Sequence, residues 1–497
     1  MSHPLLRRPT PPAPPRLRPW LAALALVPLV AAACDGGSGG VTPDPDPPTQ
    51  ATPEPALRLR YDHLDHLGQN TATSGGTPAR IVHIYADAPT YAWVGDDDEG
   101  VACVDDAARA AVAYLKAYER TQSADAREKA RQLLTFVLSM QAPQGTFYNF
   151  VWDASLRINT VHANSKADRF EWWGARAVWA LGEGARVLKG TPEADAYVAA
   201  IRKTYPHLRQ MLMLYGQTRS ANGFTFPRWA INETAYDATS ELLLGLVAVQ
   251  AAYPDTETGT FVTRFSEAIE AARFGTLTTF PYGGHAAWSG GWHAWGNSQT
   301  QALASAGRLT SAKAEADAMY ARLLVDGWQH ELDYASRNWR TFEQIAYDVR
   351  TVSAGLARLA RASGDAKYGV MAGLAASWLT GNNVAGVAMY DSTTGRGYDG
   401  INGPEQVNRN SGAESTIEAL LTLEEIQPVE DARRWLFARA AAAPVEKTVG
   451  GQQLRYRVFT VTNAGKTLRT GALVLNLTAG TSDWRTGAAL DALVAAP

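Results

Sequence analysis

Carboxylic acids at the starts of Ala-rich segments are the residues best suited to chemistry in this sequence. Asp105 and Asp106 lie side by side before an apolar run, and Asp237 and Glu414 hold similar positions further along the chain. A carboxyl group can give or take a proton in a transition state, and two adjacent acids raise each other's pKa, which helps one to stay protonated. We therefore predict that acid–base catalysis would use these four residues.

The same acids could instead serve only to start helices. Asp105 is a good N-cap, and Asp106 would then favour the positive end of the helix dipole. Arg109, three and four residues further on, could pair with either acid. Glu414 could complete a capping box that begins at Ser411. The residue pattern alone leaves the catalytic and the capping interpretations open.

Aromatic and polar side chains gather in the Gly- and Asn-rich segments around these helix starts. Loop backbone tends to lie at the surface, so such rings can line a groove. Flat rings stack on the C–H faces of sugars, while carboxylates, amides and guanidinium groups bind sugar hydroxyls. We predict a sugar-binding groove. Its candidate residues are Trp172, Trp173, Arg228, Trp229, Glu233, Tyr236, Trp292, Trp295, Asn297, Gln299, Tyr347, Asp348, Asn383 and Asn410.

These side chains are positioned by six motifs, each of which begins with an acid or an amide. Asp and Asn are good N-caps, so each motif predicts a helix start, with Glu171 better suited to the first turn than to the cap. The motifs recur at intervals of about 60 residues, which is typical of repeat architectures. They begin at Asp105, Glu171, Asp237, Asn297, Asp348 and Asn410.

The helices that the motifs open are apolar on most faces, whereas the segments between them are charged and amphipathic. Helices apolar all round are usually buried on both sides, and amphipathic ones face solvent. The amphipathic segments begin near Ser123, Thr191, Thr258, Ser311, Gly364 and Glu430. This alternation predicts an all-α fold, an (α/α)6 barrel of six inner and six outer helices over residues 58–442, entered through short β elements. An open helical solenoid is the alternative, but the count of six and the long loops favour closure.

Three segments resemble the six-hairpin glycosidase superfamily of (α/α)6 enzymes, without matching one family within it. They are Asp98-Glu-Gly-Val-Ala-Cys-Val-Asp-Asp-Ala-Ala-Arg-Ala110, Glu171-Trp-Trp-Gly-Ala-Arg-Ala177 and Asn408-Arg-Asn-Ser-Gly-Ala-Glu-Ser-Thr-Ile-Glu418. The resemblance implies hydrolysis of glycosidic bonds, or elimination on uronic-acid polymers as in other enzymes of this fold. Fold alone does not decide between them.

In a closed six-hairpin barrel, the first and sixth inner helices are neighbours. Asp105 and Asp106 would then face the same cavity mouth as Glu414. Glycoside hydrolysis needs one carboxyl group that protonates the leaving oxygen and a second that activates water or attacks the sugar. We predict Asp105 or Asp106 as the base and Glu414 as the acid, with Asp237 as a competing second carboxylate. The preferred function is a glycoside hydrolase that cleaves an oligo- or polysaccharide.

Two other functions remain as alternatives. A polysaccharide lyase acting on a uronate polymer would need a Tyr, His or Arg base and a basic groove, for which Arg228, His285 and His293 are candidates. A non-catalytic glycan-binding lipoprotein would instead have aromatic platforms without two carboxyl groups at catalytic separation.

Residues 1–34 have the composition of a lipoprotein-type export signal. Four arginines precede a short apolar run at 20–30, and three alanines precede Cys34. The run is too short to span a bilayer stably, so a cleaved signal fits better. We predict lipidation of Cys34 and anchoring to a bacterial membrane, at the periplasmic or cell-surface side. A plain secretory signal cut near Ala33 is the alternative.

The remaining regions carry less functional information. Residues 35–57 are a Gly- and Pro-rich linker, and residues 443–497 predict a small β appendage with a hairpin turn at Asn463–Gly465. Cys103 lies among apolar residues, which predicts a buried, inert thiol. The 46 basic and 49 acidic residues nearly balance and form no basic stripe, which argues against a nucleic-acid partner. We predict no metal and no cofactor, and we expect a monomer.

Overall fold

The computed structural model describes residues 52–441 and 443–496, which belong to one compact unit, Thr52–Pro497. The signal-type segment, with Cys34, and most of the 35–57 linker lie outside the described residues. Contacts of the folded unit already include Pro53, whose carbonyl oxygen accepts a hydrogen bond from the Asn463 side chain at 2.9 Å. Among the described helices, none is both long and apolar enough to cross a membrane.

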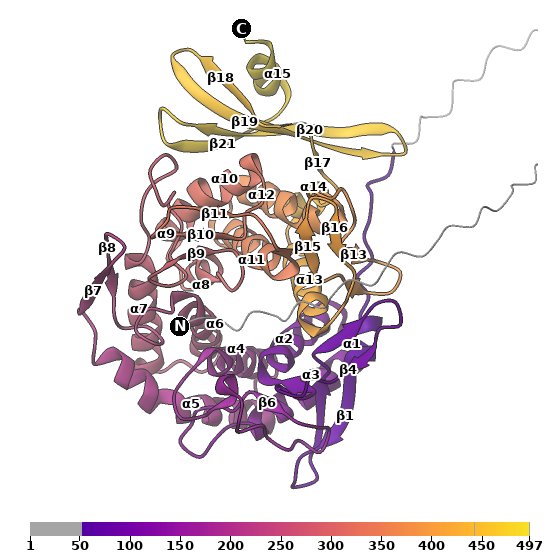
Figure 1. Cartoon of the computed structure of the whole chain (residues 1–497), viewed down its shortest axis with the longest axis vertical. Helices are drawn as coiled ribbons and strands as arrows, with labels where there is room; N and C mark the ends of the chain where they lie inside the picture. The colour runs from indigo at the N-terminus through magenta and orange to yellow at the C-terminus, as the bar shows by residue number, and fades with distance from the viewer. Residues whose placement is uncertain (1–51, 442, 497) are drawn as a thin grey trace, which may run out of the picture. The chain divides into compact units, whose positions relative to one another are not determined.

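Six inner helices form a closed ring, which follows the colour of the chain from indigo to orange in Figure 1. Each packs against the next in chain order, and the last packs against the first, so the barrel prediction is confirmed and the open solenoid is wrong. The six are α2 (Val104–Thr121), α4 (Trp172–Val187), α6 (Tyr236–Ala252), α8 (Gln299–Ser305), α11 (Ala346–Ser363) and α13 (Ala413–Ile426).

The outer layer follows the predicted amphipathic segments. Each outer helix packs on the inner helix that precedes it in the chain. The outer helices are α3 (Ala124–Ser139), α5 (Pro192–Leu212), α7 (Thr256–Ala271), the continuous α9 (Leu309–Glu315), η2 (Ala316–Tyr320) and α10 (Ala321–Asp326), then α12 (Ala366–Ala376) with η3 (Ser377–Thr380), and α14 (Glu430–Trp435). Their apolar stripes and the inner helices make one continuous core.

Small residues let the inner helices approach closely. Gly182 on α4 faces Gly245 on α6, and a Cβ atom on either glycine would overlap backbone atoms of the other helix. Packed interiors tolerate such overlap poorly. The predicted core positions Trp179 and Trp378 are indeed buried.

The six helix starts lie where the motifs predict them, but only Glu171 among the acids and amides that begin the motifs is an N-cap. The N-cap residues are Cys103, Glu171, Ala235, Ser298, Ile345 and Gly412. Asp105, Asp237 and Asp348 stand in the first turns instead, where their carboxylates bind Arg and His side chains of the barrel. Glu171 is itself at a cap position, contrary to its predicted first-turn place. The Ser411–Glu414 capping box is also absent, because Gly412 is the cap.

Short strands, one α-helix and one 3-10 helix build the segments before the inner helices. They include the hairpin β3–β4 and the three-stranded sheets β11-β10-β9 and β12-β15-β16. The elements are α1 (Asp62–Leu67), β1 (Gly68–Ala72), β2 (Pro78–Val82), β3 (Tyr85–Asp87), β4 (Ala92–Val94), β5 (Ala102–Cys103), β6 (Phe150–Val151), η1 (Ala163–Ser165), β7 (Thr218–Ala221), β8 (Phe224–Pro227), β9 (Gly291–His293), β10 (Glu331–Asp333), β11 (Trp339–Arg340), β12 (Gln344–Ile345), β13 (Tyr390–Asp391), β14 (Arg396–Gly397), β15 (Gly400–Gly403) and β16 (Gln406–Asn408).

The C-terminal β appendage is an antiparallel sheet ordered β17-β19-β20-β21, with β18 also paired to β19. Alternate residues of β19 face opposite ways: Phe459 and Val461 join the barrel core, while Leu454 and Tyr456 pack with the last helix. The predicted hairpin is present, and the helix after it was not predicted. The elements are β17 (Arg439–Ala440), β18 (Val445–Val449), β19 (Gln452–Asn463), β20 (Lys466–Asn476), β21 (Thr481–Arg485) and α15 (Gly487–Ala495).

Candidate active site at the mouth of the barrel

The long connections of the barrel all precede inner helices. Each connection from an inner to an outer helix has only two to four residues, so all inner helices run in the same direction. Their N-termini and the long segments before them therefore share one end of the barrel, which we call the mouth. Peptide N–H groups and the helix dipole at such ends favour negative charge.

Two carboxylates occupy equivalent positions at the mouth, on neighbouring helices. Asp105 is the second residue of α2, and Glu414 is the second residue of α13. The Asp105 side chain is 18% exposed and the Glu414 side chain 48% exposed. Asp105 binds Arg176 Nη1 at 2.8 Å and accepts a hydrogen bond from Asn149 at 3.0 Å. Glu414 binds Arg109 Nη1 at 3.1 Å.

One helical turn deeper, buried charges form a chain across the barrel. Arg176 on α4 contacts Glu241 on α6 at 3.5 Å, and Glu241 binds Arg350 on α11 at 2.9 Å. Glu418 on α13 lies between the guanidinium groups of Arg350 and Arg109, at 2.7 Å from each. Glu241 and Glu418 are fully buried, so each acid depends on its arginines to offset the loss of water. The chain links five of the six inner helices.

Arg109 joins this buried chain to the acids of the mouth. Its guanidinium group binds Asp106 through Nη2 at 2.7 Å and both Glu414 and Glu418 through Nη1. Asp106 is buried, in contrast to Asp105 beside it. The structure thus brings together three of the four predicted catalytic acids, Asp105, Asp106 and Glu414. A single side chain contacts two of them.

Tyr347 is the aromatic side chain at the centre of the three arginines. Its ring lies 5.1 to 5.4 Å from the guanidinium carbons of Arg109, Arg176 and Arg350. Its hydroxyl accepts a hydrogen bond from Arg176 Nη2 at 2.5 Å. Burial raises the pKa of Tyr347, against the effect of Arg176, so the phenol stays neutral. These contacts make Tyr347 a rigid support for the arginines.

Two acids at the mouth hold their protons more tightly than usual. Burial raises the pKa of Asp106 to about 6, with Arg109 opposing the rise and Glu414 adding to it. Asp106 also accepts a hydrogen bond from the Cys103 thiol at 3.3 Å. Burial likewise raises the pKa of Asp399 to about 6, although the Ser415 hydroxyl that it binds lowers it. Both carboxyl groups are influenced by the charge of Glu414.

The fourth predicted acid belongs to a different, buried group. Asp237 lies 3.1 Å from His293 Nε2, and the His293 ring stacks on Trp295 with 3.6 Å between ring centres. Asp348 lies 3.1 Å from His330, and burial raises its pKa against the effect of that histidine. All four acid and imidazole side chains are buried. Asp237 is also the second residue of its helix, α6, but it is buried, unlike Asp105 and Glu414.

Four of the predicted platform aromatics lie in the core and offer no open ring face. Trp292 and Tyr236 are fully buried, because the ring of Trp292 packs edge-on to Trp339 and the Tyr236 hydroxyl donates to the Pro227 carbonyl. Trp173 and Trp229 are almost as buried, and their indole N–H groups donate to backbone carbonyls. Their prediction as sugar platforms is wrong.

Two predicted aromatics remain partly exposed at the mouth. Trp172 and Trp295 have ring centres 6.5 Å apart, and Trp172 lies 5.0 Å from the guanidinium carbon of Arg176. Gly296 lies against the Trp172 ring and the Tyr347 hydroxyl, so a larger residue there would collide with both. Trp288, in the same loop as Trp295, is 42% exposed. Trp172 thus leaves apolar surface beside Arg176, the residue that binds Asp105.

The predicted polar groups have varied surroundings. Arg228 and Glu233 bind each other at 2.8 Å on the surface, and the Asn383 side chain is used within its own turn. Asn410 stays partly exposed at the mouth, where its side chain accepts from the backbone N–H of Ala88. Asn297 and Gln299 are fully buried. Arg228, Glu233 and Asn383 therefore have partners that leave them less suited to binding hydroxyls.

The buried charges are the site residues that the sequence predictions missed. Arg176, Glu241, Arg350 and Glu418 stand at the fifth or sixth position of their inner helices. A charge at that depth in a helix whose next turn is apolar is a signal that could have found them.

The fold and the mouth together define an (α/α)6 barrel of the six-hairpin type. Solved structures with this fold include the cellobiose 2-epimerase from Bacillus thermoamylovorans, at 12% identity and a TM-score of 0.50, covering 70% of this chain and 92% of that one. The cellobiose 2-epimerase from Spirochaeta thermophila has 11% identity and a TM-score of 0.50, covering 70% of this chain and 90% of that one. No protein-family model and no curated protein matches the sequence. At these identities the likeness is one of fold.

Proposed function

We propose that the protein is a glycoside hydrolase that cleaves an oligo- or polysaccharide at the mouth of the barrel. The observation that carries the proposal is the placement of two partly exposed carboxylates, Asp105 and Glu414, on adjacent inner helices, with the partly exposed Trp172 beside the arginine that binds Asp105. Hydrolysis of a glycosidic bond requires two such groups on opposite sides of the bond. The fold of sugar-processing enzymes supports this choice by analogy only.

In this proposal Asp105 is the general base and Glu414 the general acid. Arg176 and Asn149 hold the Asp105 carboxyl group in place through two polar contacts, which suits a group that takes a proton from water. Glu414 is the most open of the acids at the mouth, which suits a group that gives a proton to the leaving oxygen of a substrate. Asp106 becomes a positioning residue that acts through Arg109, because it is too buried to touch a substrate.

The lyase alternative loses its candidate bases in this arrangement. Arg228 is paired with Glu233, His285 is fully buried against Glu315, and His293 is buried against Asp237. None of these three presents a free base to the mouth. A non-catalytic glycan-binding protein remains the contrasting outcome, since the same tryptophans would serve it.

A panel of neutral and charged oligosaccharides tests the proposal. We expect new reducing ends with the unaltered chain, and a loss of roughly 10²–10⁴-fold in rate for Asp105→Asn or Glu414→Gln. Products that absorb in the ultraviolet would instead identify a lyase. Binding without turnover would identify a glycan-binding protein, and conversion of the reducing sugar into its C2 epimer without cleavage would identify an isomerising enzyme.

We further propose export and lipid attachment at Cys34. The arginines, the short apolar run and the small residues before Cys34 support it. Radiolabelled fatty acid should enter the full-length chain in a bacterial host and should not enter a Cys34→Ser variant. Equal labelling of both chains would refute lipidation at this residue.

A further inference from the structure

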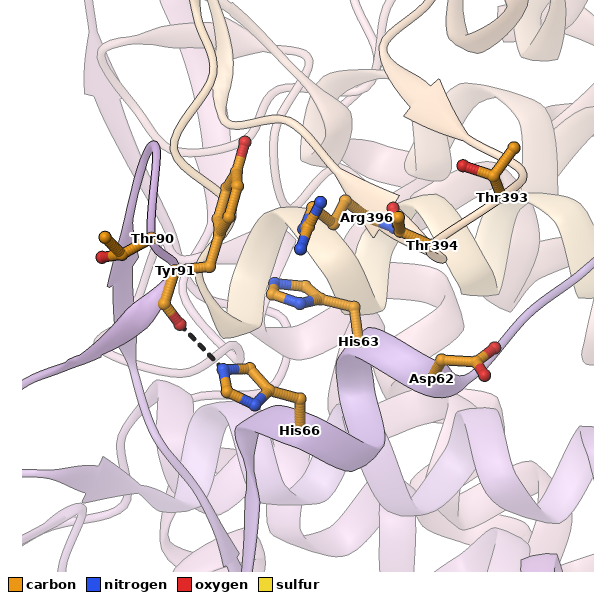
Figure 2. A pocket seen from close by; sticks show the side chains of 8 residues that line it. All are labelled: Asp62, His63, His66, Thr90, Tyr91, Thr393, Thr394 and Arg396. Carbon is orange, nitrogen blue, oxygen red and sulfur yellow. Dashed lines mark hydrogen bonds between the residues drawn. The ribbon is translucent and has the colours of Figure 1, made fainter.

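An open cavity of about 350 Å³ lies outside the proposed catalytic site. It is bordered by the first helix, the turn between β3 and β4, and the β13–β14 hairpin (Figure 2). Its volume is at the lower end of the range for small-molecule pockets. Its lining residues are Asp62, His63, His66, Thr90, Tyr91, Thr393, Thr394 and Arg396.

Arg396 is a half-buried cation in this cavity that pairs with no carboxylate among the described residues. Its guanidinium carbon lies 4.0 Å from the centre of the Tyr91 ring, which holds the guanidinium plane by cation–π contact. Its Nε atom is buried without a hydrogen-bond partner in residues 52–441 and 443–496. Asp391, its cross-strand neighbour, is instead bound by the hydroxyls of Thr393 and Thr394. The two Nη groups make no hydrogen bond to a described residue and are not among the buried atoms, so these N–H donors are available to a ligand.

The neighbouring histidines present acceptor atoms to the same cavity. His63 Nε2 lies 2.8 Å from the Ser411 carbonyl oxygen, and His66 Nε2 lies 2.8 Å from the Tyr91 carbonyl oxygen. A carbonyl oxygen only accepts, so each Nε2 carries a proton, and a neutral His63 ring has a lone pair on Nδ1. Burial lowers the pKa of His63 to about 4, and the charge of Arg396 lowers it further. Figure 2 shows the His63 ring beside the Arg396 guanidinium group.

The remaining charge at the cavity does not neutralise Arg396. Asp62 is paired with Arg60, whose Nε lies 2.8 Å from its carboxylate. The cavity thus offers one unpaired guanidinium group, a neutral imidazole that accepts hydrogen bonds, and threonine hydroxyls. An oxyanion with attached hydroxyl groups matches this set, because Arg binds carboxylate and phosphate groups through two parallel N–H donors.

We propose that this cavity binds a small hydroxylated oxyanion, with its carboxylate or phosphate group on Arg396 and a hydroxyl donating to His63 Nδ1. The site is separated from Glu414 by the Arg409–Gly412 segment, to which Tyr91 and His63 are hydrogen-bonded. The proposal does not depend on the hydrolase activity.

Calorimetric titration of the full chain with glucuronate, inorganic phosphate and glucose tests the proposal. We expect glucuronate or phosphate to bind and glucose not to bind, and the stronger of the two identifies the source of the oxyanion. Arg396→Gln should weaken binding roughly ten- to hundredfold, the usual loss for a charge-assisted hydrogen bond. Arg396→Lys should bind with intermediate strength, because it keeps the charge but not the fork.

Arg337→Gln is the matched control. Arg337 is also an arginine over an aromatic ring, at 5.1 Å from the centre of Phe280, but it lies outside the cavity. Its removal should leave binding unchanged. The proposal is overturned if neither oxyanion binds the unaltered chain, or if Arg396→Gln, shown to be folded by its thermal unfolding curve, binds as tightly as Arg337→Gln does.

Discussion

Glu414 and Glu418 form a matched pair that separates catalysis from support. Both lie on α13 and both bind the same nitrogen, Nη1 of Arg109, at 3.1 and 2.7 Å. Their side chains differ in exposure, because Glu414 is 48% exposed and Glu418 is fully buried. The same substitution, Glu to Gln, therefore removes one charge from the mouth in the first variant and one charge from the core in the second.

The two variants should differ in stability by several kcal/mol. An exposed ion pair contributes about 0–1 kcal/mol, so Glu414→Gln should leave the unfolding free energy almost unchanged. Glu418 lies between Arg109 and Arg350, and its loss leaves two buried guanidinium groups with too little negative charge. Removing one partner of a buried pair costs about 3–5 kcal/mol. Activity should show the opposite order, with a loss of roughly 10²–10⁴-fold for Glu414→Gln because a general acid is gone.

Urea unfolding and initial rates on one oligosaccharide substrate measure both quantities. Glu414→Gln should unfold at the urea concentration of the unaltered chain and release few reducing ends, whereas Glu418→Gln should unfold at lower urea and retain part of its activity at low temperature. A stable Glu414→Gln variant with unchanged rate would refute the assignment of the acid. An equal loss of stability in both variants would mean that Glu414 is structural.

Three further predictions follow from the site and the barrel. Burial raises the pKa values of Asp106 and Asp399 to about 6, above the value of Asp in the unfolded chain. Their protonated forms therefore stabilise the fold, and this contribution to the unfolding free energy falls as pH rises from about 4 to 6. Changing both residues to Asn should flatten that part of a plot of urea midpoint against pH. Trp172→Ala should raise KM about tenfold with little change in melting temperature, because Trp172 is partly exposed at the mouth. Trp292→Ala should instead lower the unfolding free energy by about 3–5 kcal/mol, because Trp292 is buried. Calorimetry measures both changes in stability. Gly245→Ala should destabilise the α4–α6 contact by about 1–3 kcal/mol in chemical unfolding, and an unchanged midpoint would contradict the close approach described here.

The arrangement of helices could be predicted because it depends on local patterns. Six motif starts and six amphipathic segments recur in order, and burial on one face or on all faces determines which helix lies inside. Asp105 and Glu414 could be placed at one mouth for the same reason, since the first and last helices of a closed ring are neighbours. The C-terminal hairpin was visible from its alternating residues and its turn.

The partners of individual side chains could not be predicted, because they depend on distant segments. Asp105 is a suitable N-cap by type, yet the cap is Cys103 and the Asp105 carboxylate binds Arg176, which lies on the next inner helix. Trp292 and Tyr236 precede or open a helix as Trp172 does, but the loops fold their rings into the core. Spacing determines the helix on which a residue lies and does not determine whether its loop buries it.

The buried chain of charges is itself an argument for a function at the mouth. A well-packed apolar core is often as stable as a buried ion-pair network, so stability alone gives little reason for Arg109, Arg176 and Arg350 to lie inside the barrel. Each arginine also contacts a residue at a helix start on the mouth. Arg176 binds Asp105, Arg109 binds Glu414 and Asp106, and Arg350 donates to Ser298 at the start of α8. The acids that contact Arg109 and Arg176 outnumber the three arginines, and the raised pKa of the buried Asp106 accords with this excess of negative charge. The arginines thus hold Asp105 and Glu414 in place at the mouth, as the proposed hydrolysis requires of its two carboxyl groups.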